Sequence, residues 1–147
     1  MINSDSTRDN FTISTDKQRL HVDVIHSFLS TSYWATNVPR AVVERSIENS
    51  LCFGVFQDSA QIGFARVIND YATFAYLADV FILEPYRGQG LSKWLLKTIL
   101  DYPDLQGLRR WLLATKDAHG LYQQFGFEPL SEPRNFRQIV NPNVYSV

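Results

Sequence analysis

The sequence predicts an α/β or α+β fold in which helices cover a central mixed, largely antiparallel sheet. Two helical patterns come first, a run of strand patterns follows, and the chain then alternates between strand and helix. Its 147 residues suit one domain, because two cores would each be too small to bury enough surface. Hydrophobic residues make up 45% of the chain and aromatic residues 14%, which is ample for a packed core and argues against disorder.

The first part of the chain predicts an arm, a strand and two helices. Residues 1–10 are polar and unpatterned, so we expect a loose N-terminal arm, with residues 11–147 as the single domain. Residues 10–15 alternate apolar and polar side chains, which predicts a short strand. Residues 23–30 and 39–49 carry apolar side chains at helical spacing, which predicts two helices that precede the main sheet.

The middle of the chain predicts the strands at the centre of the sheet. Two apolar runs, residues 51–56 and 61–68, are separated by a short polar stretch, which predicts an antiparallel hairpin. Residues 73–83 form a longer run that is rich in Phe, Tyr, Val and Ile, and we expect a central strand there. The strand ends near Pro85, because proline has no backbone donor for a ladder.

The last part predicts an alternation of helices and strands. Residues 91–102 carry a helical apolar stripe, and residues 118–125 form a second, shorter helix. Between them, residues 111–114 have the composition of a strand. Residues 127–130 and 136–140 are expected as the final strands. In total we expect about six or seven strands and about four helices.

Charge and cysteine content restrict the partners and the compartment. The 14 basic and 15 acidic residues leave a net charge of -1, which gives no general attraction to nucleic acids or anionic membranes. Cys52 has no second cysteine to pair with, and its apolar surroundings predict a buried strand position. With no apolar run of about 20 residues and no leader pattern, we expect a cytoplasmic protein.

A glycine-containing loop at residues 87–92 is the sharpest local signal for a ligand. It lies between a predicted strand and a predicted helix, where glycines let backbone N–H groups approach a ligand and the helix start favours an anion. The pattern therefore indicates a pyrophosphate site. The alternative is that Gly88 and Gly90 only permit a tight turn. The spacing matches neither a P-loop nor a dinucleotide-binding fingerprint.

Two motifs resemble those of the GNAT superfamily of N-acetyltransferases. Residues 80–92, an apolar strand followed by Arg-Gly-Gln-Gly-Leu-Ser, are similar to its acetyl-CoA motif, with Ser92 where Gly or Ala is usual. Residues 121–127 resemble its later Tyr-x-x-x-Gly-Phe signature. The order of elements from about residue 10 to 140 also agrees, so the chain is identified as a small single-domain, bacterial-type member with the GNAT fold.

The resemblance implies an acetyl-CoA site and no metal. It implies backbone contacts of the pantetheine arm with Val80, Phe81 and Ile82. The expected pyrophosphate residues are Arg87, Gly88, Gln89, Gly90, Leu91, Ser92 and Lys93, although Lys93 could equally be a solvated surface side chain. His21 and His26 have no Cys or third His at ligand spacing, so we expect no metal site.

Tyr122 is the candidate general acid for transfer of the acetyl group to a primary amine. When the amine attacks the thioester directly, the departing thiolate needs a proton, and a phenol with a pKa of about 10 is protonated at neutral pH. The alternative is that Tyr122 only packs its short helix against the sheet. A covalent acyl-cysteine route is disfavoured because the one thiol, Cys52, is expected to be buried.

The general base stays open between three candidates. Some family members use a Glu on the strand before the last helix, but residues 108–112 contain no carboxylate. Asp79 lies in an apolar strand, where desolvation would favour a catalytic role, although a structural hydrogen bond is an equal alternative. His119 lies one helical turn from Tyr122. An ordered water could also take the proton.

The acceptor pocket is expected around Tyr33 and Trp34, in the loop between the first two helices, with Arg40 nearby and Phe136 or Arg137 opposite. Aromatic walls suit a flat or amphipathic amine of a small molecule or peptide, although both side chains could simply close the domain edge. A non-catalytic acyl-CoA sensor or interaction module is the competing function, and a longer acyl donor is a further alternative. Homodimers are common in the superfamily, so we include one among the expected partners.

Overall fold

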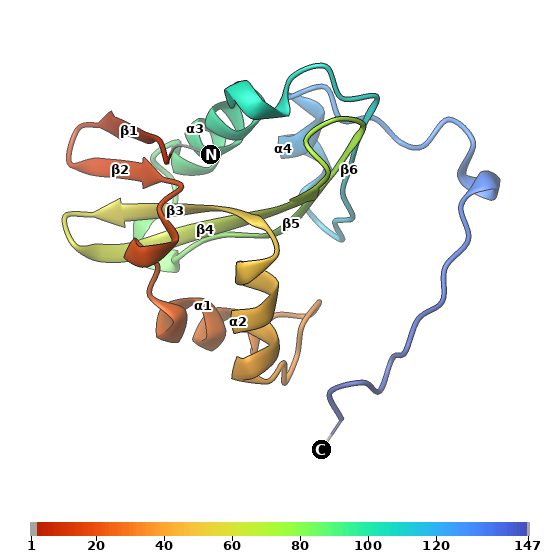
Figure 1. The fold of residues 1–147 in the computed structure, drawn as a ribbon, viewed down its shortest axis with the longest axis horizontal. Helices are drawn as coiled ribbons and strands as arrows, with labels where there is room; N and C mark the ends of the chain where they lie inside the picture. Colours follow the sequence, from red (N-terminus) through yellow and green to blue (C-terminus); the bar gives the residue numbers. More distant parts are fainter. Residues whose placement is uncertain (1–2, 147) are drawn as a thin grey trace.

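The computed structural model describes residues 3–146, which form one mixed sheet flanked by helices (Figure 1). The strands lie side by side in chain order: β1 (Asp5–Arg8), β2 (Phe11–Ser14), β3 (Leu51–Gln57), β4 (Ala60–Asn69), β5 (Phe74–Ile82) and β6 (Arg110–Leu112). All neighbours are antiparallel except β5 and β6, which are parallel. The sheet class predicted from the sequence is therefore confirmed.

The helices cover both faces of this sheet. The α-helices are α1 (Val22–Leu29), α2 (Arg40–Glu48), α3 (Leu91–Leu100) and α4 (His119–Gln123). Short 3-10 turns are η1 (Lys17–Arg19), η2 (Glu84–Tyr86), η3 (Pro103–Leu105) and η4 (Pro133–Asn135). Figure 1 shows α1 and α2 on one side of the sheet and α3 and α4 on the other. Among residues 3–146, no helix is long and apolar enough to cross a bilayer.

Each face of the sheet has its own hydrophobic core. On the α3 face, Leu95, Leu96 and Ile99 are fully buried against β2–β5, and each such side chain contributes about 1.5–3 kcal/mol of transfer free energy. On the α1–α2 face, helix side chains pack with Phe64 and Phe81. Cys52 is buried in this second core, and burial raises the pKa of its thiol to about 12. The two cores fix β5 from both sides.

The pairing of β5 with β6 is short, and this opens the sheet. The ladder joins residues 74–76 to residues 110–112 and stops at the pair Tyr76 and Leu112. β5 continues to Ile82 without a strand on that side among the described residues. The second half of β5 therefore keeps one row of backbone groups free.

A β-bulge interrupts β5 on its other side. Between the pairs Phe64↔Phe81 and Arg66↔Ala78, the register shifts, so that Asp79 and Val80 face a single residue of β4. Asp79 has a left-handed backbone conformation with φ of 57°, which Asp tolerates better than most residues. Bulges of this kind redirect side chains and occur near functional sites.

The expectation of a loose arm over residues 1–10 is wrong for residues 5–8, which form β1. The strand pairs with β2, and Thr15 fixes its start because the Ser4 N–H donates to the Thr15 hydroxyl at 2.8 Å. β1 is an edge strand, and three of its four residues are exposed. A strand with no buried face needs no apolar alternation, so the sequence pattern could not reveal it.

The strands predicted at residues 127–130 and 136–140 are also wrong within this chain. These residues belong to no ladder of the sheet. After α4 the chain runs outward and arcs back, ending near α1 and α2 (Figure 1). Pro129 and Pro133 remove two backbone donors from this stretch.

Candidate active site

The loop between β5 and α3 is held to the strand that precedes it. The Arg87 Nε–H donates to the Ile82 carbonyl at 2.8 Å. The Gln89 Nε2–H donates to the Tyr86 carbonyl at 2.9 Å. Two side chains of the loop thus bond backbone groups behind it, which leaves the backbone of the glycines on the outside.

Gly88 and Gly90 have the backbone conformation that an anion site of this kind needs. Both have φ of +82°, a region that costs residues with a Cβ about 1–2 kcal/mol. Gly90 is the N-cap of α3 and no side chain caps the helix there. The amides of Leu91, Ser92 and Lys93 therefore lack intrahelical acceptors and carry the positive end of the helix dipole.

Arg8 of β1 lies beside this helix start, although nothing in the sequence pattern indicates it. A Cβ at Gly90 would be 3.6 Å from Arg8 Nη2, and the Arg8 guanidinium carbon lies 5.9 Å from the Trp94 ring centroid. The ion pairs of residues 3–146 do not include Arg8. A guanidinium at the positive end of a helix is unfavourable by itself and favourable once an anion lies between them.

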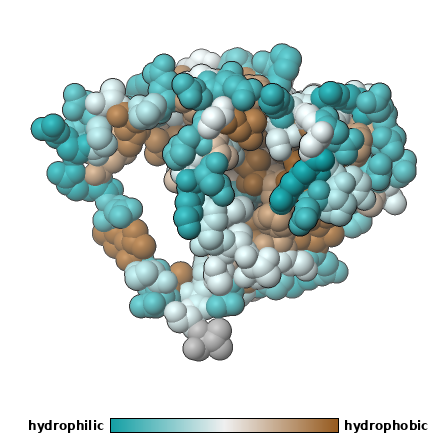
Figure 2. Space-filling view, turned by 180° about the vertical axis from the view of Figure 1, so that it is seen from behind, coloured by the Kyte–Doolittle hydropathy of each residue, from teal (hydrophilic) through white to brown (hydrophobic). Residues whose placement is uncertain are grey.

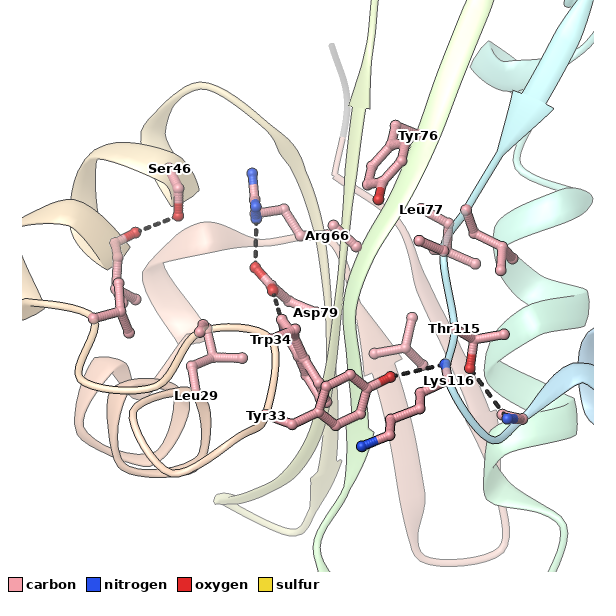
Figure 3. A pocket seen from close by; sticks show the side chains of 18 of the residues that line it. Leu29, Tyr33, Trp34, Ser46, Arg66, Tyr76, Leu77, Asp79, Thr115 and Lys116 are labelled. Carbon is pink, nitrogen blue, oxygen red and sulfur yellow. Dashed lines mark hydrogen bonds and ion pairs between the residues drawn. The ribbon is translucent and has the colours of Figure 1, made fainter. Parts of the chain in front are cut away.

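A pocket of about 620 Å³ opens where β5 separates from the chain after β6. One wall comes from the α1–α2 loop and α2, the floor from β4 and β5, and the other wall from residues 113–118 with Tyr122 (Figure 3). Its charged lining residues are Arg66, Asp79, Lys116 and Asp117. Two positive and two negative groups give the pocket no net charge.

Asp79 is the centre of a polar network at the floor of the pocket. Its Oδ2 accepts from Arg66 Nε at 2.8 Å and its Oδ1 accepts from Trp34 Nε1 at 2.8 Å. The side chains of Arg66 and Asp79 are only 17% and 10% exposed. Arg66 Nη1 also donates to the Ser50 hydroxyl at 3.1 Å. The bulge at Asp79 thus joins β4, β5 and the aromatic loop, as Figure 3 shows.

Tyr33 and Trp34, which the sequence analysis places at the acceptor pocket, form one aromatic wall of this pocket. Their rings meet edge to face with centroids 5.1 Å apart. The Lys116 backbone N–H donates to the Tyr33 hydroxyl at 3.0 Å, and Lys116 Nζ lies 5.4 Å from the centre of the same ring. Tyr33 therefore reaches across the pocket mouth to the opposite wall (Figure 3).

Comparisons with known proteins agree with this architecture. The acetyltransferase (GNAT) family profile matches residues 21–127. The chain belongs to this family. A Gibberella zeae protein with a provisional acetyltransferase name is 32% identical over 139 residues, covering 79% of this chain and 77% of that protein.

Solved structures show the same fold for this acetyltransferase. A GNAT-family protein of Xanthomonas campestris pv. campestris, provisionally named an acetyltransferase, is 49% identical with a TM-score of 0.92, covering 96% of this chain and 100% of that one. A GNAT acetyltransferase of Elizabethkingia anophelis, solved with acetyl-CoA bound, is 15% identical with a TM-score of 0.64, covering 92% and 91%. The predicted fold and family are therefore confirmed.

Tyr122 of the acetyltransferase lines the pocket from α4. Burial raises the pKa of its phenol to about 12, and the neighbouring Tyr33 and Asp117 add to this rise. The phenol is therefore neutral over the whole physiological range. Among the hydrogen bonds of residues 3–146, none uses the Tyr122 hydroxyl, so it is free to meet a ligand.

Asp79 and His119, the two side chains predicted as possible general bases, have different surroundings in the structure. Both oxygens of Asp79 are already bound to Arg66 and Trp34, which matches the structural alternative kept open for this residue. His119 is exposed at the start of α4 and is not among the residues that line the pocket. Among the described residues, no group of three or more His, Cys, Asp and Glu side chains could hold a metal.

Other expected acceptor residues lie elsewhere. Arg40 pairs with Asp23 on the surface, away from the pocket lining. Phe136 lies under the Arg110 guanidinium, 5.0 Å from ring centre to Cζ. Arg137 is likewise outside the lining.

Sequence reasoning missed Arg66, Lys116 and Tyr145, which do line the pocket. Arg66 could have been found as a lone charge inside an apolar strand. Lys116 and Tyr145 lie in stretches without periodicity, where the sequence offers no comparable signal.

Proposed function

We propose that this acetyltransferase moves an acetyl group from acetyl-CoA to a primary amine of a small molecule or peptide by direct attack. The observation that carries the proposal is the place of Tyr122, a neutral phenol with a free hydroxyl at the pocket formed where β5 and β6 separate. One side of the pocket is bordered by the part of β5 that has no β6 partner. The opposite side is the aromatic wall of Tyr33 and Trp34. Donor and acceptor can thus meet beside Tyr122.

The donor would lie along the second half of β5 and end on the loop before α3. On the side away from β4, the second half of β5 has no strand partner, and its backbone groups around Val80 and Phe81 suit the amides of a pantetheine arm. The Ile82 carbonyl at its end already accepts from Arg87. The pyrophosphate would be held by the region formed by Arg87, Gly88, Gln89, Gly90, Leu91, Ser92 and Lys93. Arg8 would add a guanidinium to the same phosphates. The acetyl-CoA bound to the Elizabethkingia anophelis relative supports this donor.

The acceptor would enter between Tyr33 and Trp34 and the opposite wall. An aromatic face attracts an ammonium group by about 0.5–2 kcal/mol, which favours a substrate that arrives as a cation and loses its proton before attack. Asp79 holds the Trp34 indole in place and is itself held by Arg66. We assign Asp79 a positioning role and leave removal of the amine proton to a water in the pocket.

The proposed reaction moves one proton from nitrogen to sulfur. The amine nitrogen forms a bond to the thioester carbonyl carbon, and the tetrahedral intermediate collapses with cleavage of the carbon–sulfur bond. Tyr122 donates its proton to the departing sulfur and regains one, through water, from the nitrogen. The pKa of Tyr122, about 12, lies above that of a thiol, about 8.5, so transfer of the proton to a fully formed thiolate would leave an unfavourable tyrosinate. The proton therefore moves to sulfur as the carbon–sulfur bond breaks, while the proton released by the nitrogen returns to Tyr122 through water.

The competing function is a non-catalytic acyl-CoA sensor or interaction module, and the absence of a carboxylate in residues 108–112 favours it. The two are separated by incubating the protein with acetyl-CoA and a panel of polyamines, amino acids and peptides. An enzyme releases CoA thiol in proportion to acetylated amine, whereas a sensor binds acetyl-CoA and releases none above the rate without protein. Longer acyl-CoA donors belong in the same panel.

Two further expectations accompany this proposal. We propose that the enzyme acts in the cytoplasm, which the buried free thiol of Cys52 supports. We also propose that it works as a homodimer rather than with a nucleic acid or membrane partner, in keeping with its net charge of -1.

A further inference from the structure

The guanidinium of Arg66 has a nitrogen that the protein itself does not use. Its Nε donates to Asp79 at 2.8 Å and its Nη1 donates to the Ser50 hydroxyl at 3.1 Å. The hydrogen bonds of residues 3–146 do not include Nη2, and no buried side-chain nitrogen or oxygen in this part of the chain lacks a partner. Because Arg66 lines the pocket, Nη2 is open to the pocket and can donate to a ligand.

Holding Asp79 in place does not require the whole guanidinium. An arginine carries more N–H groups than the bonds to Asp79 and Ser50 use. Figure 3 shows the side chain extending from β4 toward α2, where Ser46 lies, with Asp79 below it. The side chains of Arg66 and Asp79 are mostly buried, and polar groups at such positions are normally matched by a partner. The free nitrogen therefore suits an acceptor atom that a ligand supplies.

The neighbour of Arg66 on the next strand also offers a donor. In the β4–β5 ladder, Arg66 is paired with Ala78, and Ile68 with Tyr76. Arg66 and Tyr76 are thus diagonal neighbours on one face of the sheet, about 7–8 Å apart at their backbones, and the small Ala78 side chain leaves space beside them. Tyr76 lines the pocket, and the hydrogen bonds found within residues 3–146 do not include its hydroxyl. This end of the pocket therefore favours a ligand group that accepts hydrogen bonds.

The wall that carries Tyr122 has the opposite character. Asp117 lines the pocket, and it belongs to none of the ion pairs within residues 3–146. Burial, the neighbouring Tyr33 and the charge of Asp117 raise the pKa of Tyr122 to about 12, so Asp117 lies near this phenol. The Lys116 ammonium is placed over the Tyr33 ring at the mouth, 5.4 Å from its centre. A ligand cation is thus favoured beside Tyr122, and a ligand anion beside Arg66.

We propose that the acetyl acceptor is an amino acid, whose carboxylate accepts a hydrogen bond from Arg66 Nη2 while its amine faces Tyr122. The proposal rests on the acetyl transfer proposed above and names the substrate class. A carboxylate forms a charge-assisted hydrogen bond with a guanidinium. A diamine would bring a second cation to Arg66, and a peptide N-terminus would bring a neutral amide. Arg66 is thereby a specificity-determining residue.

The subsite lies close to the place where the amine and the thioester would meet. The donor arm is proposed to lie along Val80 and Phe81, and Asp79 directly precedes them in β5. Arg66 is one hydrogen bond away from Asp79, at 2.8 Å. The carboxylate and the reacting amine can therefore belong to one small molecule.

The pocket has the size and the access that a small acceptor needs. Its volume of about 620 Å³ is in the range of sites for small ligands. Tyr145, near the end of the chain, contributes to the lining. Figure 2 shows the C-terminal segment before it as an arc separated from the body by an open gap. This arc therefore leaves the part of the body beneath it accessible to a small molecule.

The test compares acceptors that differ at the carboxylate. Phenylalanine, leucine and lysine are each assayed beside their amides and beside phenethylamine, isopentylamine and cadaverine, the amines that lack the group. With wild-type protein and acetyl-CoA, kcat/KM should be about 10- to 100-fold higher for the amino acid than for either partner, because the guanidinium otherwise loses a charged acceptor. Calorimetric titration in the presence of CoA measures the same preference in affinity, independently of turnover.

Removal of the guanidinium should remove the preference. Asp79→Asn with Arg66→Met eliminates both members of the ion pair, so that neither charge stays buried alone, and the preference should fall below about threefold. Asp79→Asn alone keeps the guanidinium and should keep the preference. Lys116→Gln is the matched control, because it removes the other cation of the pocket lining, and the preference should stay within about twofold of the wild type.

The outcomes separate this subsite from the acetyl transfer itself. Wild-type kcat/KM values that are equal for the amino acid and the amine without the carboxylate, or for the amino acid and its amide, would overturn the subsite and leave the transfer intact. A preference that is lost in Lys116→Gln and kept without Arg66 would also overturn it. Amino acids that bind through Arg66 but are not acetylated would keep the subsite and contradict the transfer. Neither binding nor turnover of any amino acid would contradict both.

Discussion

The loop before α3 and the pocket beside it are built in opposite ways, although they adjoin the same strand. The loop is one contiguous segment in which Arg87 and Gln89 bond local carbonyls and the glycines expose the backbone. The pocket combines side chains from the α1–α2 loop, α2, β4, β5 and the β6–α4 connection. A backbone site should tolerate most side-chain changes and fail when its φ values cannot be reached. A site built from side chains should lose activity when a single functional group is removed.

The largest expected effect is that of Tyr122→Phe. Removal of one positioned acid lowers turnover by about 100-fold or more, while acetyl-CoA affinity changes less than about twofold, because no donor-loop contact is lost. Steady-state turnover and calorimetric titration with acetyl-CoA measure the two. Tyr71→Phe, outside the pocket, is the control with the same atom removed. Equal turnover of wild type and Tyr122→Phe would exclude Tyr122 from the mechanism.

Gly90→Val tests the backbone site. The variant must either adopt φ of +82°, at about 1–2 kcal/mol, or move the helix start, and its side chain would approach Arg8. We expect acetyl-CoA affinity to fall by about 10- to 100-fold. Gly107→Val is the matched control, since Gly107 has φ of +75° with open space around it and lies outside the loop. Similar affinity losses in both variants would mean that general strain explains the effect.

Asp79→Asn tests the side-chain network. It leaves Arg66 buried without its counter-charge, which should lower the free energy of unfolding by about 3 kcal/mol. Turnover should fall less than about tenfold, since Asn can still accept from the Trp34 indole. The acidic limb of the pH–rate profile should stay in place. Adding Arg66→Met should recover part of the stability. Loss of the acidic limb in a folded Asp79→Asn protein would instead identify Asp79 as the base.

Arg8→Gln should have a smaller effect, which is confined to the binding of acetyl-CoA. Loss of one exposed charge near a phosphate should weaken acetyl-CoA binding by about fivefold and reduce its dependence on salt. Arg45→Gln is the control, because Arg45 is an exposed arginine of α2, on the opposite face of the sheet from α3. If both variants bind acetyl-CoA like the wild type at low salt, Arg8 makes no phosphate contact.

The smallest effect is expected in alkaline solution. The pKa of Tyr122 is raised to about 12 in the folded protein against about 10 when unfolded. The folded state therefore holds the proton more tightly, and the stability from this group is constant below pH 10 and lost between about pH 10 and pH 12. Chemical unfolding across this range should show a smaller loss for Tyr122→Phe than for the wild type. An equal loss would mean that the phenol is not desolvated.

The contrast between loop and pocket also explains what could be predicted from the sequence. The loop could be predicted from the sequence because its glycines, the preceding strand and the following helix are neighbours in the chain. Tyr122 was indicated by the family motif, and Tyr33 and Trp34 by two large aromatic side chains in the loop between the first two helices. All three line the pocket, and their roles in the reaction stay predictions. The partners of Asp79 were not indicated, because Arg66 reaches it only through a bulge whose register no local pattern specifies. β1 and Arg8 were missed because an exposed edge strand needs no apolar alternation.

The prediction of strands at residues 127–130 and 136–140 was wrong for a different reason. Their composition is that of strands, but a ladder requires a partner, and periodicity alone does not say whether that partner lies in the same chain. Residues 136–140 have no such partner among residues 3–146. The pattern reports a tendency of these residues to pair, and it does not identify a partner strand.

The burial of Cys52 has a practical consequence for experiments on this enzyme. Its thiol is 1% exposed and, with a pKa of about 12, contains almost no thiolate at neutral pH. A thiol reagent in the reaction mixture should therefore detect released CoA with no background from the folded protein. The same reagent, used without substrate, should label Cys52 only when β3 opens, so that its rate of labelling measures how often the sheet comes apart.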